Sequence, residues 1–263
     1  MKRLEKIYSD IKEIKIQGAT NIAKAAVDAY LMKPDAENKK RLMSLRPTEP
    51  MLSNALKFLE RLGKKKVLSH FSEAQSEINR LVFSVLKEGV IVYTHCHSTN
   101  VVKALIYAKE KGKKFEVYNT ETRPLFQGRK TAKELAKHGI KATTFVDSAL
   151  HEAIKKADIV LLGADAILKD AAINKIGSGA AAEIAFVHKK PLYIIADSWK
   201  FSPKNVTIEE RDFHEVWKNA PRRIKIRNPA FEKIEKKYIK GIISELGALS
   251  FDDFVKAAGQ DKG

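Results

Sequence analysis

Cys96, the only cysteine in this 263-residue chain, stands where a thiol would be reactive. Its neighbours are His95, His97 and Ser98, and an amphipathic stretch over 101–112 predicts that a helix begins close by. Basic neighbours and a helix N-terminus lower the pKa of a thiol and favour the thiolate, which can act as a base. The alternative is a small buried hydrophobe, the usual place of a free cysteine. With one cysteine and no cluster of further ligands, we expect no metal here.

Asp165 is a candidate general acid. It follows the apolar segment 161–164, and a carboxyl group at a dry strand end has a raised pKa that lets it hold a proton. The alternative is a helix N-cap, a common role of aspartate at such turns. Asp147 and Asp197 occupy comparable positions, and for these two we favour capping.

Two segments could bind phosphate. The segment Asn174-Lys175-Ile176-Gly177-Ser178-Gly179 places glycines and a lysine before an alanine-rich helix, a combination that suits a phosphate cradle. It lacks the spacing of a P-loop, and no GxGxxG follows the first predicted strand, so nucleotide binding is poorly supported. A loop with a solvated lysine is the alternative. Arg46, fixed beside Pro47, could present its guanidinium to phosphate, although proline-containing helix breaks are common without such a role.

The pattern after residue 89 predicts the elements that position these residues. Amphipathic stretches such as 101–112 and 131–139 separate short apolar runs rich in β-branched residues, at 90–95, 115–120, 142–147, 158–163, 192–197 and 223–228. This alternation predicts a parallel sheet with right-handed crossovers. About six strands covered on both faces make a doubly wound, Rossmann-like α/β domain.

The N-terminal part has helical spacing instead. The apolar residues of its first stretch recur on one face: Leu4, Ile7, Ile11 and Ile14. After breaks at prolines, helices are expected at about 50–62 and 70–87, with a solvated turn at 64–66. We therefore expect an N-terminal helical domain over 1–84 and a Rossmann-like domain over 85–263 that carries the site.

Polar residues gather at one end of the predicted strands. Five consecutive strands end in ionisable or hydrogen-bonding groups, at 95–98, 120–123, 147–148, 163–165 and 197–198, with Lys200 close behind the last. In open parallel sheets, ligands bind outside the carboxyl ends of the strands. The sequence therefore predicts that Cys96 and Asp165 share one site at this edge.

The charge of the chain is strongly positive, at +17, but it is spread out and forms no basic tail. Lysines that alternate with glutamates are typical of solvated helix faces, and a diffuse positive field also attracts anionic metabolites. Nucleic acid is the least favoured partner. No apolar run could span a membrane, the charged N-terminus disfavours a secretory signal, and a single cysteine cannot form an internal disulfide, so we expect a cytoplasmic protein.

The segments that carry these residues resemble one superfamily over nearly the whole chain. It joins the regulatory subunits of translation initiation factor 2B with methylthioribose-1-phosphate isomerase and archaeal ribose-1,5-bisphosphate isomerase. The matching segments are RPT (46–48), THCHS (94–98), TETRPLFQG (120–128), GADAI (163–167), INKIGS (173–178), DSWKF (197–201) and RNPAF (227–231). The cysteine and aspartate of the isomerase branches are present as Cys96 and Asp165, and TETRPLFQG with RNPAF looks most like the ribose-1,5-bisphosphate isomerases.

The resemblance implies conversion of ribose 1,5-bisphosphate to ribulose 1,5-bisphosphate, in an archaeal route that degrades AMP. In it, Asp165 would protonate the ring oxygen and the Cys96 thiolate would remove the C2 proton, with neither metal nor organic cofactor. The phosphates would be held by Gly18, Ala19, Arg46, Arg123, Gln127, Asn174, Lys175 and Lys200. The family favours homodimers or dimer-based rings, and regulation by AMP is left open.

Two positions depart from the family pattern. Gln17 stands where the isomerases usually carry an arginine that helps to hold a phosphate, and 168–171 (LKDA) replaces a turn that usually contains Asn-Gly. Two alternatives to the bisphosphate isomerase therefore stay open. One is a non-catalytic initiation-factor-2B-like subunit that binds translation machinery, and the other is methylthioribose-1-phosphate isomerase, which holds a single phosphate.

Overall fold

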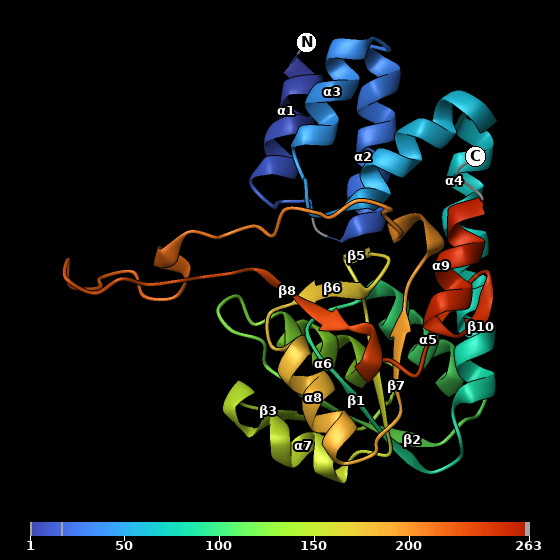
Figure 1. The fold of residues 1–263 in the computed structure, drawn as a ribbon, viewed down its shortest axis with the longest axis vertical. Helices are drawn as coiled ribbons and strands as arrows, with labels where there is room; N and C mark the ends of the chain where they lie inside the picture. The colour runs from blue at the N-terminus through green and yellow to red at the C-terminus, as the bar shows by residue number, and fades with distance from the viewer. Residues whose placement is uncertain (1, 17, 261–263) are drawn as a thin grey trace.

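The computed structural model describes residues 2–16 and 18–260, and it places a helical part at one end of an α/β part (Figure 1). The helical part is made of α1 (Lys2–Lys12), α2 (Ala19–Met32), α3 (Ala36–Ser44) and the first half of α4 (Pro50–Val85). Their apolar faces share one core, which also takes in Trp199 from a later segment. At the start of α3 the Asp35 carboxylate accepts a hydrogen bond from the Asn38 amide, as an N-cap does. The predicted helical N-terminal part is confirmed.

The long helix α4 is bent at Gly63, whose φ of 78° lies in the region that favours glycine. α4 packs on α2 as far as Phe71, and beyond Ile78 it joins the core with α5 (Thr99–Glu110) and the sheet. Ile78 and Val82 belong to the apolar core under the sheet. The predicted turn at 64–66 is wrong, because those residues are helical directly after the bend. The division of the chain at 84/85 stays a prediction.

The main sheet has seven strands among the residues that the structure describes. Their order across the sheet is β10 (Gly247–Leu249), β9 (Gly241–Ser244), β7 (Leu192–Ile195), β4 (Ile159–Leu162), β1 (Val90–Thr94), β2 (Phe115–Thr120) and β3 (Ala142–Phe145). All neighbours are parallel except β10, which is antiparallel to β9. The chain runs outward from β1 through β2 to β3 and then returns to the other side of β1 with β4. The reversal between β1 and β4 is the topological switch point, where doubly wound sheets bind ligands.

Helices cover both faces of the sheet. On one face the core is built from the second half of α4, from α5 and from Leu135 of α6 (Gln127–Lys137). On the other it is built from α7 (Leu150–Lys156), α8 (Ser178–Val187) and α9 (Phe251–Gln260). The predicted doubly wound, Rossmann-like α/β architecture is confirmed. No helix in the described part of the chain is long and apolar enough to cross a membrane.

The predicted strand at 223–228 is wrong. That segment belongs to an arm, defined here as residues 202–230, that projects from the body with only the short 3-10 turn η3 (Phe213–Glu215) inside it (Figure 1). Ile224 is 48% exposed, and no neighbouring strand pairs with the segment. A run that alternates apolar and basic residues can look like a strand, but it needs a partner to become one.

Further elements were not predicted. A small antiparallel sheet has the order β5 (Ala166–Ile167), β6 (Ala171–Lys175) and β8 (Phe231–Glu235). The unusual turn 168–171 connects β5 to β6, and within it the Leu168 amide donates to the Ala171 carbonyl at 2.7 Å. The remaining elements are 3-10 turns: η1 (Asp147–Ala149), η2 (Ser198–Lys200) and η4 (Lys236–Tyr238).

Candidate active site

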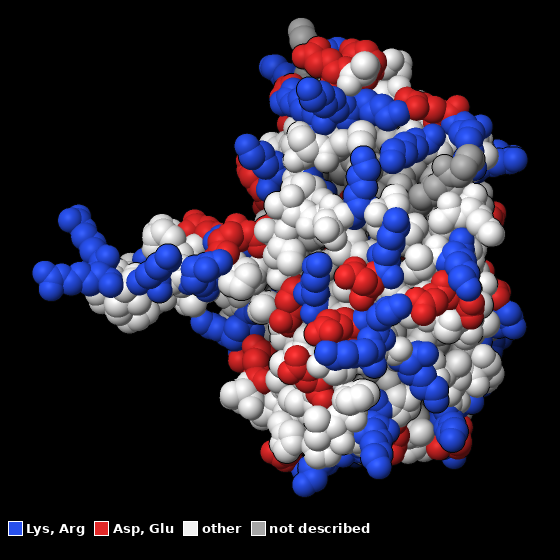
Figure 2. Space-filling model, in the orientation of Figure 1, with Lys and Arg blue, Asp and Glu red and all other residues white. Residues whose placement is uncertain are grey.

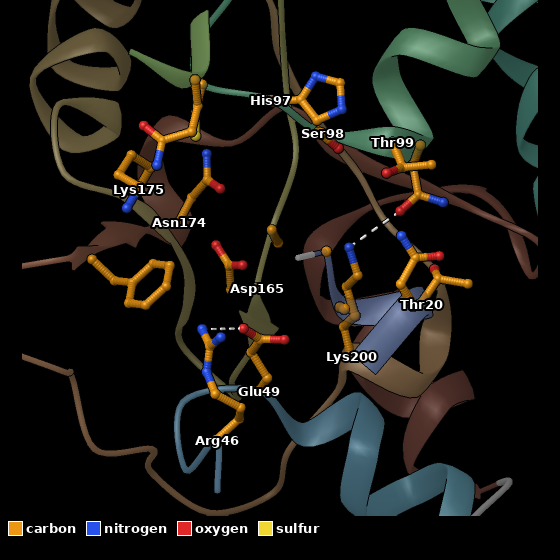
Figure 3. Close-up of a pocket in the computed structure, with 18 of the residues that line it drawn as sticks. Thr20, Arg46, Glu49, His97, Ser98, Thr99, Asp165, Asn174, Lys175 and Lys200 are labelled. Carbon is orange, nitrogen blue, oxygen red and sulfur yellow. Dashed lines mark hydrogen bonds and ion pairs between the residues drawn. The ribbon is translucent and has the colours of Figure 1, made fainter. Parts of the chain in front are cut away.

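A cavity of about 130 Å³ opens at the switch point, between the carboxyl ends of β1 and β4 and the helical part. Its wall takes residues from the start of α2, the loop before α4, the segment after β1, the start of α6, β6 and the arm. In Figure 3 the Asp165 carboxylate lies near the centre, with Asn174 and Lys175 on one side and Lys200 on the other. The sequence predicted that the ends of five strands meet at this edge of the sheet. Of these, the segments that follow β1, β4 and β7 supply residues that line the cavity.

Cys96 follows β1 and lines the cavity in a left-handed backbone conformation, with φ 62°. Its amide donates to the Thr122 hydroxyl at 3.1 Å, and its carbonyl accepts from the Thr131 hydroxyl at 2.8 Å. Burial raises the pKa of the thiol to about 11, and Lys175 is the main group that opposes this rise. The predicted lowering of the Cys96 pKa is therefore wrong. Removal from water outweighs the nearby positive charge.

His95 has a structural position beside this thiol. Its Nε2 lies 2.9 Å from the Ile176 carbonyl, so this nitrogen carries the proton, and its Nδ1 accepts from the Thr120 hydroxyl at 2.7 Å. Burial lowers the pKa of His95, which keeps the ring neutral. The ring thus ties the end of β1 to the loop after β6, and a Cβ on Gly177 would come within 3.0 Å of it.

His97 is also neutral. The Thr131 hydroxyl already donates to Cys96, so it accepts from His97 Nδ1–H at 3.0 Å. Burial lowers the pKa of His97 to about 4. The ring lines the cavity without adding charge to it.

Asp165 follows β4, with its side chain in the cavity. Burial raises the pKa of its carboxyl group, although Lys200, Lys175 and Arg46 act against the rise. This is the direction that the sequence predicted. Asp165 caps no helix, because the next element is the strand β5.

The other two aspartates have different roles from each other. Asp197 caps η2 by accepting from the Trp199 amide at 2.9 Å, as predicted. The prediction for Asp147 is wrong, because it caps no helix. Its carboxylate holds the loop after β2 by accepting from the amides of Thr122 and Arg123, at 2.8 and 2.6 Å.

The segment 174–179 supplies side chains to the cavity, but its glycine amides are already used. Glu232 accepts from the amides of Gly177 and Gly179, at 2.6 and 2.7 Å, and so fills the N-terminus of α8. The predicted backbone cradle for phosphate is therefore occupied by this chain's own carboxylate. Lys175 and Asn174 line the cavity through their side chains, with Lys175 Nζ 4.9 Å from the centre of the Phe231 ring.

Arg46 reaches the cavity, but carboxylates surround it. Its Nη2 lies 2.5 Å from Glu49 and its Nε 3.1 Å from Glu209. Both Arg46 and Glu49 are buried, and burial raises the pKa of Glu49 to about 7. Lys200 is buried as well and donates to the Asn100 side chain at 3.1 Å, while burial lowers its pKa.

The remaining predicted phosphate ligands divide into three groups. Gly18, Ala19 and Gln127 line the cavity. Arg123 does not: its guanidinium donates to the Val216 carbonyl at 3.3 Å and lies over the Phe126 ring. Gln17 lies outside the described residues.

Four buried side-chain atoms within residues 2–16 and 18–260 have no hydrogen-bond partner, and all belong to residues that line this cavity. They are Glu49 Oε2, Gln127 Oε1, Arg211 Nε and Arg211 Nη1. An unsatisfied buried polar group costs roughly 1–3 kcal/mol, so such groups are rare unless a ligand or water completes them. All four lie at one cavity, where water or a ligand would complete them.

The sequence reasoning missed Glu49, Lys130 and Arg211, which also line the cavity. Glu49 was detectable, because it directly follows the segment Arg46-Pro47-Thr48. Lys130 lies one helical turn after Gln127, which was predicted. Nothing in the sequence marks Arg211, which belongs to the irregular arm.

One group of side chains could hold a metal ion among the residues described, and it lies outside the cavity. It consists of His70, Asp197 and Glu245, whose ligand atoms lie within 4.8 Å of one another. His70 Nε2 lies 3.1 Å from Asp197, and its ring stacks on Trp199 at 3.8 Å. These contacts link α4 to the sheet edge.

Comparisons with known proteins agree with this architecture. The model of the initiation factor 2 subunit family matches residues 13–251. A ribose 1,5-bisphosphate isomerase from Methanocaldococcus jannaschii is 36% identical, over 94% of this chain and 91% of that protein, and one from Archaeoglobus fulgidus is 35% identical, over 91% and 87%.

Two solved structures superpose on this chain over most of its length. The translation initiation factor eIF-2B of Pyrococcus horikoshii superposes with a TM-score of 0.85 at 27% identity, covering 95% of this chain and 98% of that one. A 5-methylthioribose 1-phosphate isomerase from the same organism, at 24% identity, a TM-score of 0.76 and coverages of 98% and 88%, shares the fold. On the sequence match and these relatives, the chain belongs to the initiation factor 2 subunit family.

Proposed function

We propose that this protein is an aldose–ketose isomerase that converts ribose 1,5-bisphosphate to ribulose 1,5-bisphosphate. The observation that carries the proposal is a carboxyl group and a thiol on the two strand ends that flank the switch point, in a cavity also lined by Arg46, Lys175 and Lys200. Relatives named ribose 1,5-bisphosphate isomerase, at 31–36% identity, support the choice of substrate.

Asp165 acts first, as the acid. Its raised pKa favours the protonated form, which donates to the ring oxygen while the bond between that oxygen and C1 breaks. Cys96 takes the proton from C2, and a double bond forms between C1 and C2. The proton on Cys96 then returns to C1, and the Asp165 carboxylate removes the proton of the C2 hydroxyl, which leaves the ketone.

The thiol must lose its proton before it can serve as the base. With a pKa of about 11 in the ligand-free cavity, only a small fraction of Cys96 is thiolate near neutral pH. Lys175 stabilises that fraction, since its charge lowers the pKa of the thiol. We therefore assign Lys175 two tasks, namely phosphate binding and support of the thiolate.

The phosphates would be bound by the cationic and amide groups of the wall. Lys175, Lys200, Asn174 and Gln127 reach the cavity with side chains, and Gly18 and Ala19 with backbone at the start of α2. Holding both phosphates fixes the sugar between acid and base, which lowers the entropic part of the barrier. Arg123 would join them only if the loop after β2 changed its conformation.

Assays with two sugars test the proposal. Purified protein is incubated with ribose 1,5-bisphosphate and, separately, with methylthioribose 1-phosphate, and products are separated by anion exchange. We expect conversion of the bisphosphate alone. Conversion of methylthioribose 1-phosphate would replace the substrate assignment, and wild-type protein that neither binds nor converts either sugar would overturn the isomerase proposal.

A non-catalytic subunit of the initiation-factor-2B type is the second candidate, favoured by the close superposition on eIF-2B of Pyrococcus horikoshii. On this alternative, Cys96→Ser changes no property of the protein, and initiation factor 2 is recovered from extracts with it. Loss of isomerase activity in Cys96→Ser separates the two candidates.

We also propose a homodimer or a ring of dimers, a cytoplasmic location and no required cofactor, with AMP as a regulator to be tested by adding it to the assay. The arm supports self-association, because it exposes apolar side chains: Ile208, Phe213, Val216, Trp217 and Ile224.

A further inference from the structure

We infer that Arg211, on the arm, is an anion-binding residue of the cavity, and that its guanidinium contacts one phosphate of the ligand. The identity of that ligand rests on the proposed function, whereas anion binding by Arg211 does not.

Two of the guanidinium nitrogens of Arg211 have no partner for their donors. Its Nε and Nη1 are buried, line the cavity and have no hydrogen-bond partner among the described residues. No ion pair joins its guanidinium to a carboxylate in the part of the chain that the structure covers. A buried charge without a partner is costly, and an oxyanion supplies both the opposite charge and the missing acceptors.

The guanidinium of Arg46, in contrast to that of Arg211, is already paired with carboxylates. Glu49 and Glu209 each contact its guanidinium, at 2.5 and 3.1 Å, so a phosphate at Arg46 would have to displace a carboxylate or lie beside two of them (Figure 3 shows the Glu49 contact). Like charges at such distances repel strongly in a buried site. The guanidinium of Arg211 carries no such neighbour.

The backbone at the base of the arm fixes Arg211 in place. The Arg211 amide donates to the Asn228 carbonyl, and the Ala230 amide donates to the Glu209 carbonyl, each at 2.9 Å. Both neighbours of Arg211 in the chain are carboxylates with other partners. Glu210 is held by Arg227 at 3.0 and 2.9 Å, and Asp212 accepts from the His214 amide at 2.9 Å. The outgoing and returning segments of the arm thus form a short ribbon that presents Arg211 to the cavity.

Other side chains of the same cavity suit a phosphorylated sugar. Lys175 and Phe231 line it, and Phe231 begins β8 directly after the returning segment of the arm. Gln127 also lines it and has an unpartnered atom, Oε1, which can accept from a sugar hydroxyl. Arg211 would therefore bind a phosphate in a cavity that also offers a second cation and a hydroxyl-binding group.

The test compares two arginines of the same arm. Arg211→Gln removes the charge in the cavity, and Arg222→Gln removes an exposed charge from the arm as the matched control. The dissociation constant of inorganic phosphate is measured by calorimetry, and kcat and KM are measured with ribose 1,5-bisphosphate. Arg211→Lys, which keeps the charge but not the planar fork, checks that loss of binding does not come from misfolding.

We expect Arg211→Gln to raise both the phosphate dissociation constant and KM by roughly 10-fold or more, the effect of losing a charged hydrogen bond. Arg211→Lys should recover part of this loss, and Arg222→Gln should stay within about 2-fold of wild type. Equal phosphate affinity in wild type and Arg211→Gln overturns the inference, as does wild-type protein that binds no phosphate. Weakened phosphate binding in Arg211→Gln together with no turnover by wild type would keep the inference and reject the isomerase.

Discussion

At the scale of single residues, the two groups assigned to the chemistry are both held in their neutral forms by burial. The pKa values of Asp165 and Cys96 are both raised, so the ligand-free site favours a protonated acid and a protonated thiol. The first state suits the role of Asp165, whereas Cys96 must be deprotonated before it acts. On the proposed mechanism, the charge of Lys175 is what opposes the raised pKa of Cys96.

The thiol state can be measured directly, because Cys96 is the only cysteine. We expect alkylation by iodoacetamide to be slow at pH 7.5 and to rise about tenfold per pH unit up to about pH 10, as thiolate forms below a pKa of about 11. Lys175→Met should slow alkylation further, since the charge that lowers the pKa is removed, while the exposed Lys169→Met should not. A rate that is independent of pH between 7 and 9 would show that the pKa is not raised.

For single residues, the sequence predicted the positions of Cys96 and Asp165 but not the direction of the Cys96 pKa shift. The carboxyl ends of parallel strands meet at one edge, so Cys96 and Asp165 could be placed together from the strand pattern alone. The direction of the Cys96 pKa could not, because it depends on how deeply the thiol is buried against α2 and α6, which no local pattern gives. Glu49 and Arg211 come from loops, whose conformation is set by tertiary contacts.

At the scale of elements, the contact between α4 and the sheet edge depends on buried titratable groups. His70 of α4 meets Asp197 and Glu245, and burial raises the pKa of Glu245 to about 7. The pKa of His70 is raised by Asp197 against the effect of burial. Both groups bind protons more tightly in the folded state, so their contribution to stability is present at low pH and is lost as pH rises.

We expect the free energy of unfolding to fall by roughly 1–3 kcal/mol between pH 5 and pH 8 from this source. Glu245→Gln should flatten that decline, and the exposed Glu235→Gln should leave it unchanged. Glu49, whose pKa is also raised to about 7, adds a decline of the same sign, so the flattening is partial. Urea titrations across this pH range measure the effect, and a decline that is identical in Glu245→Gln and wild type would contradict the assignment.

The bend in α4 is the second test at this scale. Gly63 has φ 78° and ψ 163°, a conformation that residues with a Cβ rarely adopt. Although no atom lies within 4 Å of a Cβ built there, Gly63→Ala should destabilise the protein by roughly 1–3 kcal/mol through backbone strain alone. Gly259→Ala, in α9 at ordinary helical angles, should be neutral or stabilising by up to about 1 kcal/mol. Equal thermal stability of the two variants would mean that the bend carries no strain.

Among the helices and strands, the sequence predicted the main sheet better than the small sheet of β5, β6 and β8. Regular alternation after residue 89 was sufficient to predict β1, β2, β3, β4 and β7. The short strands β5 and β6 form a local hairpin, and β8 joins it after the arm through a pairing with β6 between residues about 60 apart in sequence. The two predicted helices are present as the two parts of α4, on either side of Gly63, whose backbone angles are not helical.

At the scale of the whole molecule, the positive charge is as diffuse as the sequence indicated. Figure 2 shows Lys and Arg over all of the visible face with Asp and Glu between them, apart from the arm, whose outer end is basic. A field of this kind draws anions toward the molecule without defining a nucleic-acid surface. The local concentration of cations in the cavity is therefore the informative feature.

The arm gives a prediction about assembly. Trp217 is 49% exposed on a projecting segment, which is typical of an interaction surface. If the arm contacts a second copy, Trp217→Ser should shift the protein toward monomer in sedimentation analysis, whereas Phe186→Ser, which removes an exposed aromatic ring from α8, should not. An oligomeric state unchanged by Trp217→Ser would exclude this residue from the interface.

The central claim is that Cys96 and Asp165 act as an acid–base pair on one sugar phosphate. It is tested most directly by following ribose 1,5-bisphosphate in D₂O by NMR with wild type, Cys96→Ser and Asp165→Asn. The account predicts that wild type forms ribulose 1,5-bisphosphate whose C1 carries the proton taken from C2 rather than deuterium, and that kcat is lower by about 10²–10⁴-fold in each variant with little change in KM. Product formed by Cys96→Ser or Asp165→Asn at the wild-type rate would contradict it.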